Sequence, residues 1–387
     1  MADALEQRLP EVLEANALDM DAGREAGLDA SLLDRLSLDE GRVCAIAADV
    51  RRIAALPDPV GEELEGRRLE NGLEIRKVSV PLGVVAVVYE ARPNVTIDCS
   101  ALCLKSGNAI VLRGSSTAAH SNAVLAQVAR DAVGSAGLPE ALVSLVAGGG
   151  RDELAELATQ NEAVDLIIPR GGEGLKAALK QHATVPVMYA AAGNCHVFVD
   201  ASAHLDDAVA ITLNAKVQRP SVCNAVETLL VHRDAALEFL PRVLGELRES
   251  GVELRADARG RTLAGPLGDS IAAATEEDWE TEYHALILAV RVVDSVEEAI
   301  EHVNRYGSGH SDAIVTDSTD SARAFTESVD TACVYVNAST RFTDGGVFGM
   351  GAEIGNSTQK LHARGPIGVR ELCTYKYVVE GSGQVRE

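Results

Sequence analysis

Residues 81–114 read PLGVVAVVYEARPNVTIDCSALCLKSGNAIVLRG, and this stretch decides the fold. It holds two short apolar runs, VVAVVY at 84–89 and AIVLR at 109–113, which flank a helix-like segment at about 94–106. Continuous runs of Val, Ile and Leu separated by helices are typical of a parallel sheet that is covered on both faces. The stretch therefore predicts a doubly wound α/β domain.

The same alternation continues along the chain in two series. In the first series, apolar runs at 142–146 and 165–169 alternate with helix-like segments at 117–136, 151–160 and 172–182. The second series begins near residue 196, and its strand candidates are 195–200, 227–232, 285–293, 312–317 and 332–338. Two successive series of this kind predict two α/β domains.

The segment before residue 81 has a different pattern. Ser37 and Glu40 have the spacing of a capping box at the start of a helix. Pro57 and Pro59 end that helix, and residues 73–80 alternate enough for an exposed strand or one arm of a hairpin. Apolar residues recur at helical spacing in the predicted helix, at Val43, Ile46, Ala47, Val50 and Ile53.

The charge balance excludes some classes of partner. The formal net charge of the 387 residues is −23, and the 35 basic residues comprise 7 Lys and 28 Arg with no basic run. Such a field repels nucleic acid, and no apolar run approaches the roughly 18 residues that a membrane span needs. We expect a cytoplasmic protein without nucleic-acid or membrane partners. The acidic surface fits ordinary solvation or adaptation to high salt, and a GC-rich genome would also favour Arg.

Seven cysteines are present, and none forms a CxxC pair, so neither a metal site nor a disulfide framework is supported. Cys223 lies in a loop, KVQRPSVCNAVE, after Lys216 and Arg219, and nearby positive charge lowers the pKa of a thiol. On this basis a catalytic and a structural role for Cys223 are equally open. His302 and His310 flank a Gly-containing turn and do not have the spacing of a helical metal pair. The cysteines that lie in apolar patterns are interpreted as core residues: Cys44, Cys99, Cys103 and Cys333.

Two strand ends are candidates for binding phosphate groups. The dinucleotide fingerprint GxGxxG is absent, and the cluster Gly148–Gly150 has the wrong spacing for it. Free N–H groups at a helix start, with an Arg beside them, suit phosphate anions, although an ordinary turn remains an alternative at both places. The candidate residues are Arg113, Ser115 and Ser116 in LRGSST, and Arg170, Gly171 and Gly172 in IPRGGEG.

Four long motifs are more specific than any of these short ones. They are VPLGVVAVVYEARPNVT at 80–96, QRPSVCNAVETLLVH at 218–232, EEAIEHVNRYGSGHSDAIV at 297–315 and DGGVFGMGAEIGNSTQKLHARGPIGVRELCTYKY at 344–377. Through them the chain resembles the glutamate-5-semialdehyde dehydrogenases, or γ-glutamyl phosphate reductases, of the aldehyde dehydrogenase superfamily. The resemblance implies a cofactor domain at 1–195 with an oligomerisation hairpin at about 69–83, and a catalytic domain at 196–350. It also implies a return helix and an oligomerisation strand within 351–387, and hence a homo-oligomer.

The resemblance implies a reaction and roles for individual residues. The family reduces L-glutamyl 5-phosphate with NADPH to L-glutamate 5-semialdehyde and phosphate, in the second step of proline biosynthesis. By motif position Cys223 is the nucleophile, and its N–H and the side chain of Asn94 are donors to the oxyanion. Glu282 is implied as a ligand of the nicotinamide ribose, with Glu280 as the alternative. The stretch AAAGNCHVF at 190–198 lacks the carboxylate with which hydrolytic relatives activate water. Candidates for the anionic groups of the substrate are Arg92, Lys216 and Arg219.

Other interpretations stay open at this point. A related aldehyde dehydrogenase that acylates coenzyme A would share the fold and the nucleophile, and a relative without activity could act as a scaffold. Because glutamyl phosphate is labile, an association with glutamate 5-kinase is a further hypothesis. The chain also lacks the first part of the N-terminal helical region of the family, and we expect the chemistry to be unaffected.

Overall fold

The computed structural model describes residues 1–146, 150–189 and 193–386. The chain forms two compact units. Unit 1 consists of Met1–Tyr189, Gly349–Gly355 and Ile367–Glu387, and unit 2 of Ala190–Phe348 and Asn356–Pro366. The boundaries predicted from the sequence, at 195/196 and 350/351, differ from this division because hydrophobic patterns do not show that the chain crosses repeatedly between the units after residue 348.

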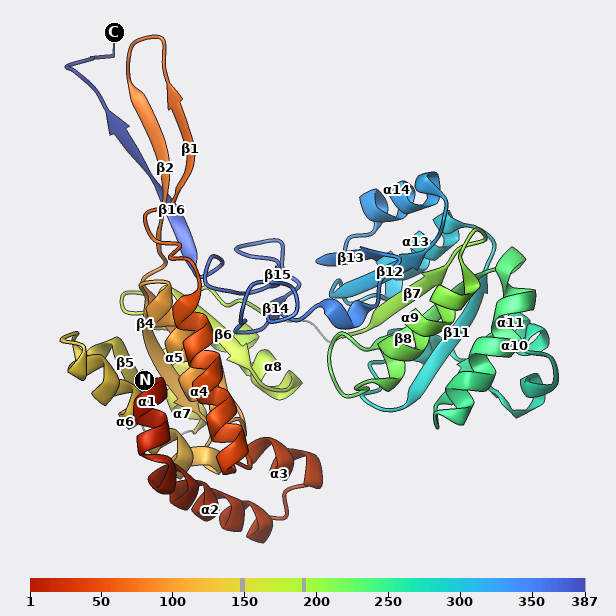
Figure 1. The fold of residues 1–387 in the computed structure, drawn as a ribbon, viewed down its shortest axis with the longest axis horizontal. Coiled ribbons are helices and arrows are strands. Elements are labelled where there is room, and N and C mark those ends of the chain that lie inside the picture. Colours follow the sequence, from red (N-terminus) through yellow and green to blue (C-terminus); the bar gives the residue numbers. More distant parts are fainter. Residues whose placement is uncertain (147–149, 190–192, 387) are drawn as a thin grey trace. The chain divides into compact units, whose positions relative to one another are not determined.

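Unit 1 is built on a four-stranded parallel sheet with the strand order β5-β4-β3-β6 (Figure 1). In its register Tyr89 pairs with both Gly114 and Arg170, so the carboxyl ends of three strands meet at one edge. The strands are β3 (Val84–Tyr89), β4 (Ala109–Gly114), β5 (Val143–Leu145) and β6 (Leu166–Arg170), close to the predicted runs.

Helices cover both faces of this sheet, as the continuous apolar runs predicted. Ala86 and Val88 of β3 share a core with apolar residues of α7 (Arg151–Leu157) and α8 (Glu173–His182). Tyr89 points to the other face, where its hydroxyl lies 2.7 Å from Thr96 Oγ1 of α5 (Asn94–Lys105). The remaining elements between the strands are η1 (Ser116–Ala118), α6 (Ala119–Ser135) and η2 (Glu140–Leu142).

Four helices precede the sheet: α1 (Ala2–Gln7), α2 (Leu9–Glu25), α3 (Ala30–Leu36) and α4 (Glu40–Ala55). Helix α4 buries the five apolar residues that predicted it. The predicted cap is wrong, because Asp39 accepts the N–H of Arg42 and Ser37 instead follows the end of α3. Cys44 is also exposed and not a core residue, since it lies off the buried face of α4, whereas Cys99, Cys103 and Cys333 are buried as predicted.

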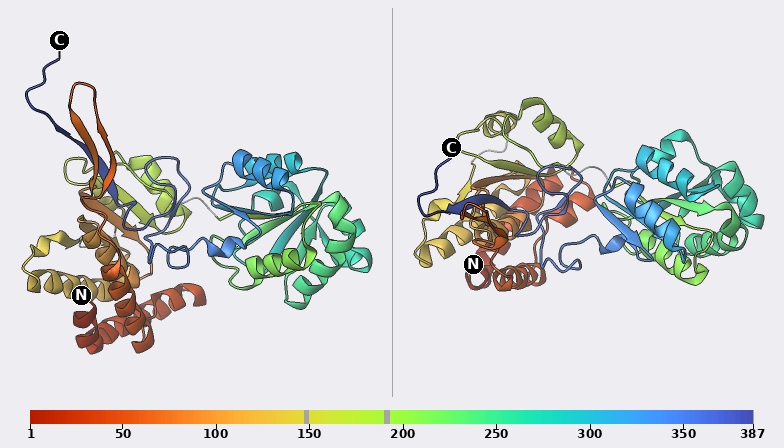
Figure 2. Two further views of the ribbon diagram at one scale, coloured as in Figure 1. Left: turned by 45° about the horizontal axis from the view of Figure 1, so that its top comes forward. Right: turned by 90° about the horizontal axis from the view of Figure 1, so that it is seen from above.

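A separate antiparallel sheet in unit 1 joins distant parts of the sequence. Its order is β1-β2-β16, with β1 (Glu63–Arg68), β2 (Glu74–Pro81) and β16 (Cys373–Glu380), and Figure 2 shows the three strands from two further sides. The hairpin thus spans residues 63–81 and not 69–83. The return helix expected after residue 350 is wrong for the described residues 351–386, which contain only β14 (Asn356–Ser357), β15 (Gly365–Pro366) and β16.

Unit 2 contains a seven-stranded parallel sheet with the order β10-β9-β11-β8-β7-β12-β13 (Figure 1). Five of its strands match predicted runs: β7 (Cys195–Val199), β8 (Val226–His232), β11 (Ile287–Val293), β12 (Ser311–Val315) and β13 (Cys333–Val336). Two short strands at one side of the sheet were not predicted: β9 (Glu253–Ala256), next to β11, and the edge strand β10 (Ala272–Ala273). The helical elements are α9 (Leu205–Val217), α10 (Arg233–Glu249), α11 (Ala258–Leu263), η3 (Gly265–Ser270), α12 (Glu276–Glu280), α13 (Val296–Tyr306), α14 (Thr319–Ser328) and η4 (Thr340–Phe342).

Alternating side chains of the interior strand β7 fill two cores, one on each face of the sheet. Val197 and Val199 pack in a cluster with apolar residues of α9 and α10. Phe198 faces the other way and stacks on Phe325 of α14, with ring centroids 6.2 Å apart. The doubly wound fold is therefore present in unit 2 as well as in unit 1.

Candidate active site

Cys223 is exposed on the turn between α9 and β8. The turn is pressed against the segment that leads into β7, because a Cβ on Gly193 would lie 2.0 Å from the carbonyl oxygen of Cys223 and 2.3 Å from its Cα. Real Cβ contacts are never this short, so only glycine fits at position 193. A close approach of two backbones thus fixes the place of this thiol at the carboxyl-terminal side of α9.

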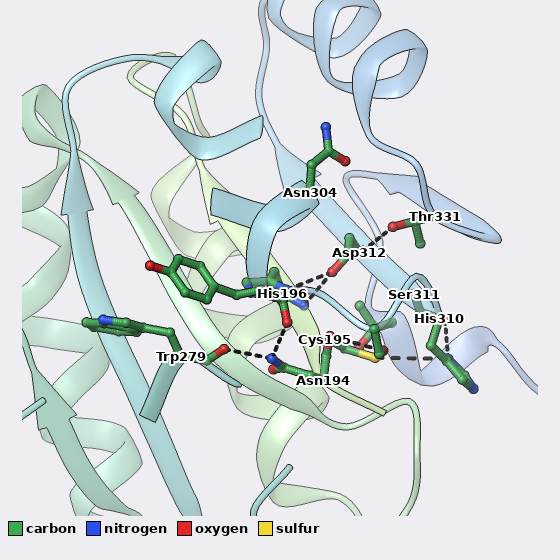
Figure 3. Close-up of polar contacts among 12 residues, drawn as sticks. Asn194, Cys195, His196, Trp279, Asn304, His310, Ser311, Asp312 and Thr331 are labelled. Atoms are coloured by element: carbon green, nitrogen blue, oxygen red, sulfur yellow. Dashed lines mark hydrogen bonds and ion pairs between the residues drawn. The ribbon is translucent and has the colours of Figure 1, made fainter. Parts of the chain in front are cut away.

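A buried cluster contacts the Cys223 turn, and Figure 3 shows three of its residues, Cys195, His310 and Ser311. The Cys195 thiol donates to the carbonyl oxygen of Cys223 over 3.2 Å, and it lies 4.0 Å from Nδ1 of His310. Nδ1 of His310 is 2.9 Å from the Ser311 hydroxyl, which in turn is 2.6 Å from the hydroxyl of Thr343. Strands β7 and β12 therefore hold the turn through side chains at their first residues.

The loop around η4 holds the other side of the turn. The Asn224 side-chain amide donates to the carbonyl oxygens of Thr343, over 2.9 Å, and Arg341, over 3.3 Å. The Thr340 hydroxyl donates back to the Asn224 carbonyl over 2.7 Å. Arg341 Nε donates to the Gln218 side chain over 2.9 Å, so both ends of the turn are bonded to one loop.

Lys216 precedes the turn, but its ammonium group is inside the protein. It lies 2.5 Å from a carboxylate oxygen of Glu227 on β8, and neither side chain is exposed. Burial lowers the pKa of Lys216 and raises the pKa of Glu227, while the attraction between the two charges opposes both shifts. In the structure Lys216 therefore serves a buried ion pair, and of the two basic residues predicted before Cys223 only Arg219 is exposed.

Glu282 also contacts Gly193. Burial of its carboxylate raises the pKa, but hydrogen bonds from His284 and from the N–H of Gly193 outweigh burial and leave the pKa below its ordinary value. The His284 Nε2 atom is 3.3 Å from this carboxylate, and 12% of the Glu282 side chain is exposed. Glu282 and Cys223 thus both contact Gly193, and Glu282 is held as an anion.

A second buried cluster, which includes His196, Trp279 and Asp312, fixes the start of β7 (Figure 3). His196 Nδ1 lies 3.0 Å from a carboxylate oxygen of Asp312, which also accepts the N–H of His196. The Asn194 amide donates to the carbonyl oxygens of Trp279 and Tyr306 over 2.7 and 2.8 Å. Both side-chain clusters act on residues 193–196, so they position Gly193 and Cys195 against Cys223.

Asn94 and Arg92 belong to unit 1. Asn94 is the first residue of α5, and its side-chain amide donates to a carboxylate oxygen of Asp98 over 2.9 Å. Burial raises the pKa of Asp98 to about 7. Arg92 is half-buried just before α5. Cys223 belongs to unit 2, so the roles of Asn94 and Arg92 stay predictions.

The carboxyl end of β4 carries a donor set that suits a phosphorylated nucleotide. Arg113 is the penultimate residue of β4, where it is buried and donates to the Gly150 carbonyl. Ser115 and Ser116 follow after Gly114, so a guanidinium and two hydroxyls lie within four residues. The N–H groups of the following helix are not free as expected, because the Asp19 carboxylate accepts the N–H groups of His120 and Ser121 over 3.1 and 2.7 Å. Any phosphate here would be bound mainly by the side chains.

The end of β6 is less suited to phosphate. The Glu90 carboxylate accepts the N–H of Gly172 over 2.9 Å and thus already provides a negative charge at the start of α8. A Cβ on Gly355 would lie 2.5 Å from a guanidinium nitrogen of Arg170, so Arg170 packs against that backbone. Of the glycine cluster 148–150, only Gly150 is among the described residues. It precedes α7, and its carbonyl accepts a hydrogen bond from Arg113. Gly148 and Gly149 lie outside the described residues, as do residues 190–192 of the AAAGNCHVF stretch.

Comparison with known proteins decides the family. The model of the aldehyde dehydrogenase family matches residues 46–280 and 272–378. The chain is 54% identical over 386 residues to a γ-glutamyl phosphate reductase of Thermobifida fusca, and 52% identical over 385 residues to that of Syntrophomonas wolfei. In both cases the match covers 100% of this chain and 91% of the relative. The chain belongs to the γ-glutamyl phosphate reductases within the aldehyde dehydrogenase family.

Solved structures agree with this assignment. A γ-glutamyl phosphate reductase of Thermotoga maritima superimposes with a TM-score of 0.97 at 48% identity, covering 100% of this chain and 92% of that one. An acetylating aldehyde dehydrogenase of Geobacillus thermoglucosidasius, 20% identical, has a TM-score of 0.68 with 100% and 91% of the chains covered. That likeness concerns the fold alone. The aldehyde-dehydrogenase-like α/β fold predicted from the motifs is thereby confirmed.

The sequence patterns did not indicate three residues that lie around Cys223. Gly193 and Cys195 lie in the stretch 190–198, whose only distinctive feature in the sequence is the lack of a carboxylate, and Arg341 lies outside the four motifs. Gly193 precedes β7, Cys195 begins it, and Arg341 follows the end of β13, but spacing along the chain gives no measure of their approach to Cys223. In the part of the chain that the structure describes, no group of three or more His, Cys, Asp or Glu side chains could hold a metal ion, and no helix is long and apolar enough to cross a bilayer.

Proposed function

We propose that this chain reduces L-glutamyl 5-phosphate to L-glutamate 5-semialdehyde and phosphate with NADPH, as the second step of proline biosynthesis in the cytoplasm. The observation that carries the proposal is the exposed Cys223, held by a fixed turn, in a chain that is 54% identical over its full length to a γ-glutamyl phosphate reductase. Membership of the aldehyde dehydrogenase family supports a nicotinamide dinucleotide as cofactor.

Cys223 supplies the nucleophile for this reaction. Its thiolate attacks the acyl carbon, the bond from that carbon to the phosphate oxygen breaks, and phosphate leaves with the bonding electrons. NADPH, when bound, supplies the hydride that reduces the resulting thioester carbon. The carbon–sulfur bond then breaks, which releases the aldehyde and returns the thiolate of Cys223. Donors near this carbon stabilise the negative oxygen during both steps, and the proposed ones are the N–H of Cys223 and the side chain of Asn94.

Several other residues are candidates for binding the cofactor and the substrate. Arg113, Ser115 and Ser116 are proposed to bind phosphates of the cofactor, because their guanidinium and hydroxyls form the donor set at the end of β4. Arg170, Gly171 and Gly172 remain weaker candidates, since Glu90 already occupies the N–H of Gly172. Glu282 is proposed for a ribose hydroxyl, because a carboxylate held as an anion accepts such a hydrogen bond. Arg92 and Arg219 are the remaining candidates for anionic groups of the substrate.

The reverse reaction tests the proposal without the unstable acyl phosphate. Glutamate 5-semialdehyde and NADP are mixed with phosphate, with coenzyme A, or with neither, and reduced cofactor is followed by absorbance for wild type and Cys223→Ala. We expect turnover that requires phosphate and disappears in the variant. Turnover with coenzyme A in place of phosphate would indicate the acylating alternative, and a protein inactive in all three mixtures at low and molar salt would indicate a scaffold.

Two features of the proposal concern assembly. Strands β1, β2 and β16 form a sheet whose last strand exposes Tyr375, Tyr377 and Val379 by 49–57%, which supports a homo-oligomer formed through this sheet. The lability of an acyl phosphate supports an association with glutamate 5-kinase. If adding the kinase in trans gives no more aldehyde per acyl phosphate made than free diffusion allows, the association is excluded.

A further inference from the structure

Two arginines accompany the nucleophile on adjoining loops of unit 2. Arg219 lies four residues before Cys223 and is exposed, whereas Arg341 is half-buried in η4. The hydrogen bonds of Arg341 to Gln218 and of Thr340 to Asn224 tie η4 to residues on either side of the interval 219–223. These bonds bring the guanidinium of Arg341 to the turn that carries both Arg219 and Cys223.

Arg219 and Arg341 differ from many other arginines of the chain because no carboxylate in the described part of the chain is paired with them. The protein has a net charge of −23, and many of its arginines form ion pairs with carboxylates. Among the described residues, no carboxylate forms an ion pair with Arg219 or Arg341. Burial lowers the pKa of Arg341 and the charge of Arg219 lowers it further, while Asp344 and Cys223 act in the opposite direction. Two like charges at this place are therefore incompletely compensated, and a bound anion would relieve their repulsion.

We propose that Arg341, together with Arg219, binds the phosphoryl group of the acyl phosphate and, in the reverse direction, inorganic phosphate. This inference rests on the proposed function. When the thiolate of Cys223 attacks, the bond from the acyl carbon to the bridging oxygen breaks, and the phosphate that leaves with the electron pair gains negative charge beside the two guanidinium groups. Planar guanidinium groups bind such oxygens through charge-assisted, bidentate hydrogen bonds.

The covalent structure of the substrate favours the phosphoryl group over the α-carboxylate. The phosphorus is separated from the acyl carbon by a single oxygen, whereas three carbons separate the α-carboxylate from it. A guanidinium group whose charge interacts with Cys223 is therefore placed for the group that leaves from the attacked carbon. Its positive charge also stabilises the transition state selectively, because the phosphate becomes more negative as the bond breaks.

Kinetics of the reverse reaction test the inference. Arg341→Gln, Arg341→Lys and Arg219→Gln are compared with wild type and with Arg323→Gln, which removes an exposed arginine from α14 of the same unit. KM is measured for phosphate and for glutamate 5-semialdehyde at constant ionic strength. We expect Arg341→Gln to raise the KM for phosphate about 10- to 100-fold, as for loss of a charge-assisted bond, with the KM for the aldehyde changed less than about threefold. The KM of Arg341→Lys for phosphate should lie between the values of wild type and Arg341→Gln, and Arg323→Gln should behave as wild type.

Two results would overturn the inference. A rise confined to the KM for the aldehyde would assign the arginines to the α-carboxylate, and unchanged values for both KM would exclude an anion site. If Arg341→Gln does not fold, as judged by circular dichroism, Arg341→Lys and Arg219→Gln still separate the two substrates. Should wild type show no phosphate-dependent turnover, the proposed function itself fails, whatever the variants do.

Alkylation of Cys223 gives a readout that does not depend on turnover. Inorganic phosphate bound by the arginines should slow the reaction of iodoacetamide with this thiol in wild type and in Arg323→Gln. We expect the protection to require at least about tenfold more phosphate in Arg341→Gln. If phosphate protects the thiol equally well in Arg341→Gln and in Arg323→Gln, or does not protect it in wild type, phosphate does not bind at this place.

Discussion

At Gly193 the absence of a side chain decides how closely two segments of unit 2 approach. A Cβ at this position would lie 2.0 Å from the carbonyl oxygen of Cys223, and the same residue donates its N–H to Glu282. The backbone cannot give way freely, because Asn194 and Cys195 on one side and Asn224 on the other are bonded to buried groups. A methyl group at residue 193 must therefore displace Cys223.

We expect Gly193→Ala to lower kcat by about 100-fold or more, because a displacement of about 1 Å near the reacting atoms has an effect of that size. The rate of alkylation of Cys223 by iodoacetamide should change as well. Gly245→Ala in α10 is the matched control, since nothing lies within 4 Å of a Cβ there, and it should keep full activity. A Gly193→Ala protein with the kcat of wild type would show that the turn can yield.

Asp98 provides a test of pH dependence. Burial raises the pKa of its carboxyl group to about 7 from 3.8, so the folded protein holds this proton more tightly than the unfolded chain does. The contribution of Asp98 is therefore most favourable below about pH 4 and is lost as the pH rises toward 7. At 1.36 kcal/mol per pKa unit, stability should fall by about 2–3 kcal/mol between pH 5 and pH 8 through this group.

Asp98→Asn should remove that part of the pH dependence. The urea midpoints of the variant and of wild type are measured at pH 5 and pH 8. We expect the midpoint of the variant, relative to that of wild type, to be higher at pH 8 than at pH 5. Asp21→Asn, which changes an exposed residue of α2, controls for the loss of a charge. Equal midpoint differences at the two pH values would show that Asp98 is ionised in the folded protein throughout.

At the scale of elements, the ion pair of Lys216 and Glu227 joins the end of α9 to β8 directly before and after the Cys223 turn. Removing one partner leaves the other buried without compensation, which is more harmful than removing both. We expect Lys216→Met to destabilise unit 2 by about 3–5 kcal/mol and Lys216→Met with Glu227→Leu to restore much of that stability. Urea unfolding of the single and double variants measures the difference.

Activity of the same variants separates this structural role from substrate binding. If the buried pair only supports the turn, the double variant should regain turnover together with stability, with KM for both substrates near wild type. If the double variant folds but its KM for phosphate or aldehyde stays raised, Lys216 is a substrate ligand after all.

The elements that the sequence predicted are those whose own side chains determine them. Strands β3 and β7 are continuous apolar runs, so their own sequence predicts burial on both faces. Helix α4 has an apolar residue at every turn, so its own sequence predicts burial on one face. Strands β9 and β10 are short and have exposed positions, and their pairing depends on neighbours distant in sequence. The cap of α4 was assigned to Ser37 because the spacing to Glu40 fits, although Asp39 makes the bond.

The site was predictable only in part for the same reason. Cys223 could be found because its loop is polar and belongs to a long motif, and resemblance then gave it a role. The burial of Lys216, the occupation of two helix starts by Asp19 and Glu90, and the place of Arg341 all arise from contacts between distant segments. Such contacts leave no pattern in the local sequence.

For the whole molecule, the net charge of −23 sets the response to salt. Self-repulsion of the carboxylates destabilises the compact state, and dissolved ions screen it with a Debye length of about 8 Å at 0.15 M and about 3 Å at 1 M. We expect the thermal midpoint to rise with potassium chloride. If screening alone acts, most of the gain should be reached by about 0.5 M, whereas a protein adapted to high salt should gain further up to molar concentrations.

The matched condition is pH 5, close to the isoelectric point of about 4.8, where the net charge is small. Because little repulsion is left to screen, the rise in midpoint between 0.05 M and 1 M salt should shrink well below its value at pH 7.5. Differential scanning calorimetry at the two pH values measures both slopes on the same protein. A salt effect of equal size at both would attribute the stabilisation to exclusion of salt from the protein surface, which does not depend on net charge. A midpoint that falls with salt at pH 7.5 would show that the surface ion pairs of the arginines outweigh the repulsion among the acidic residues.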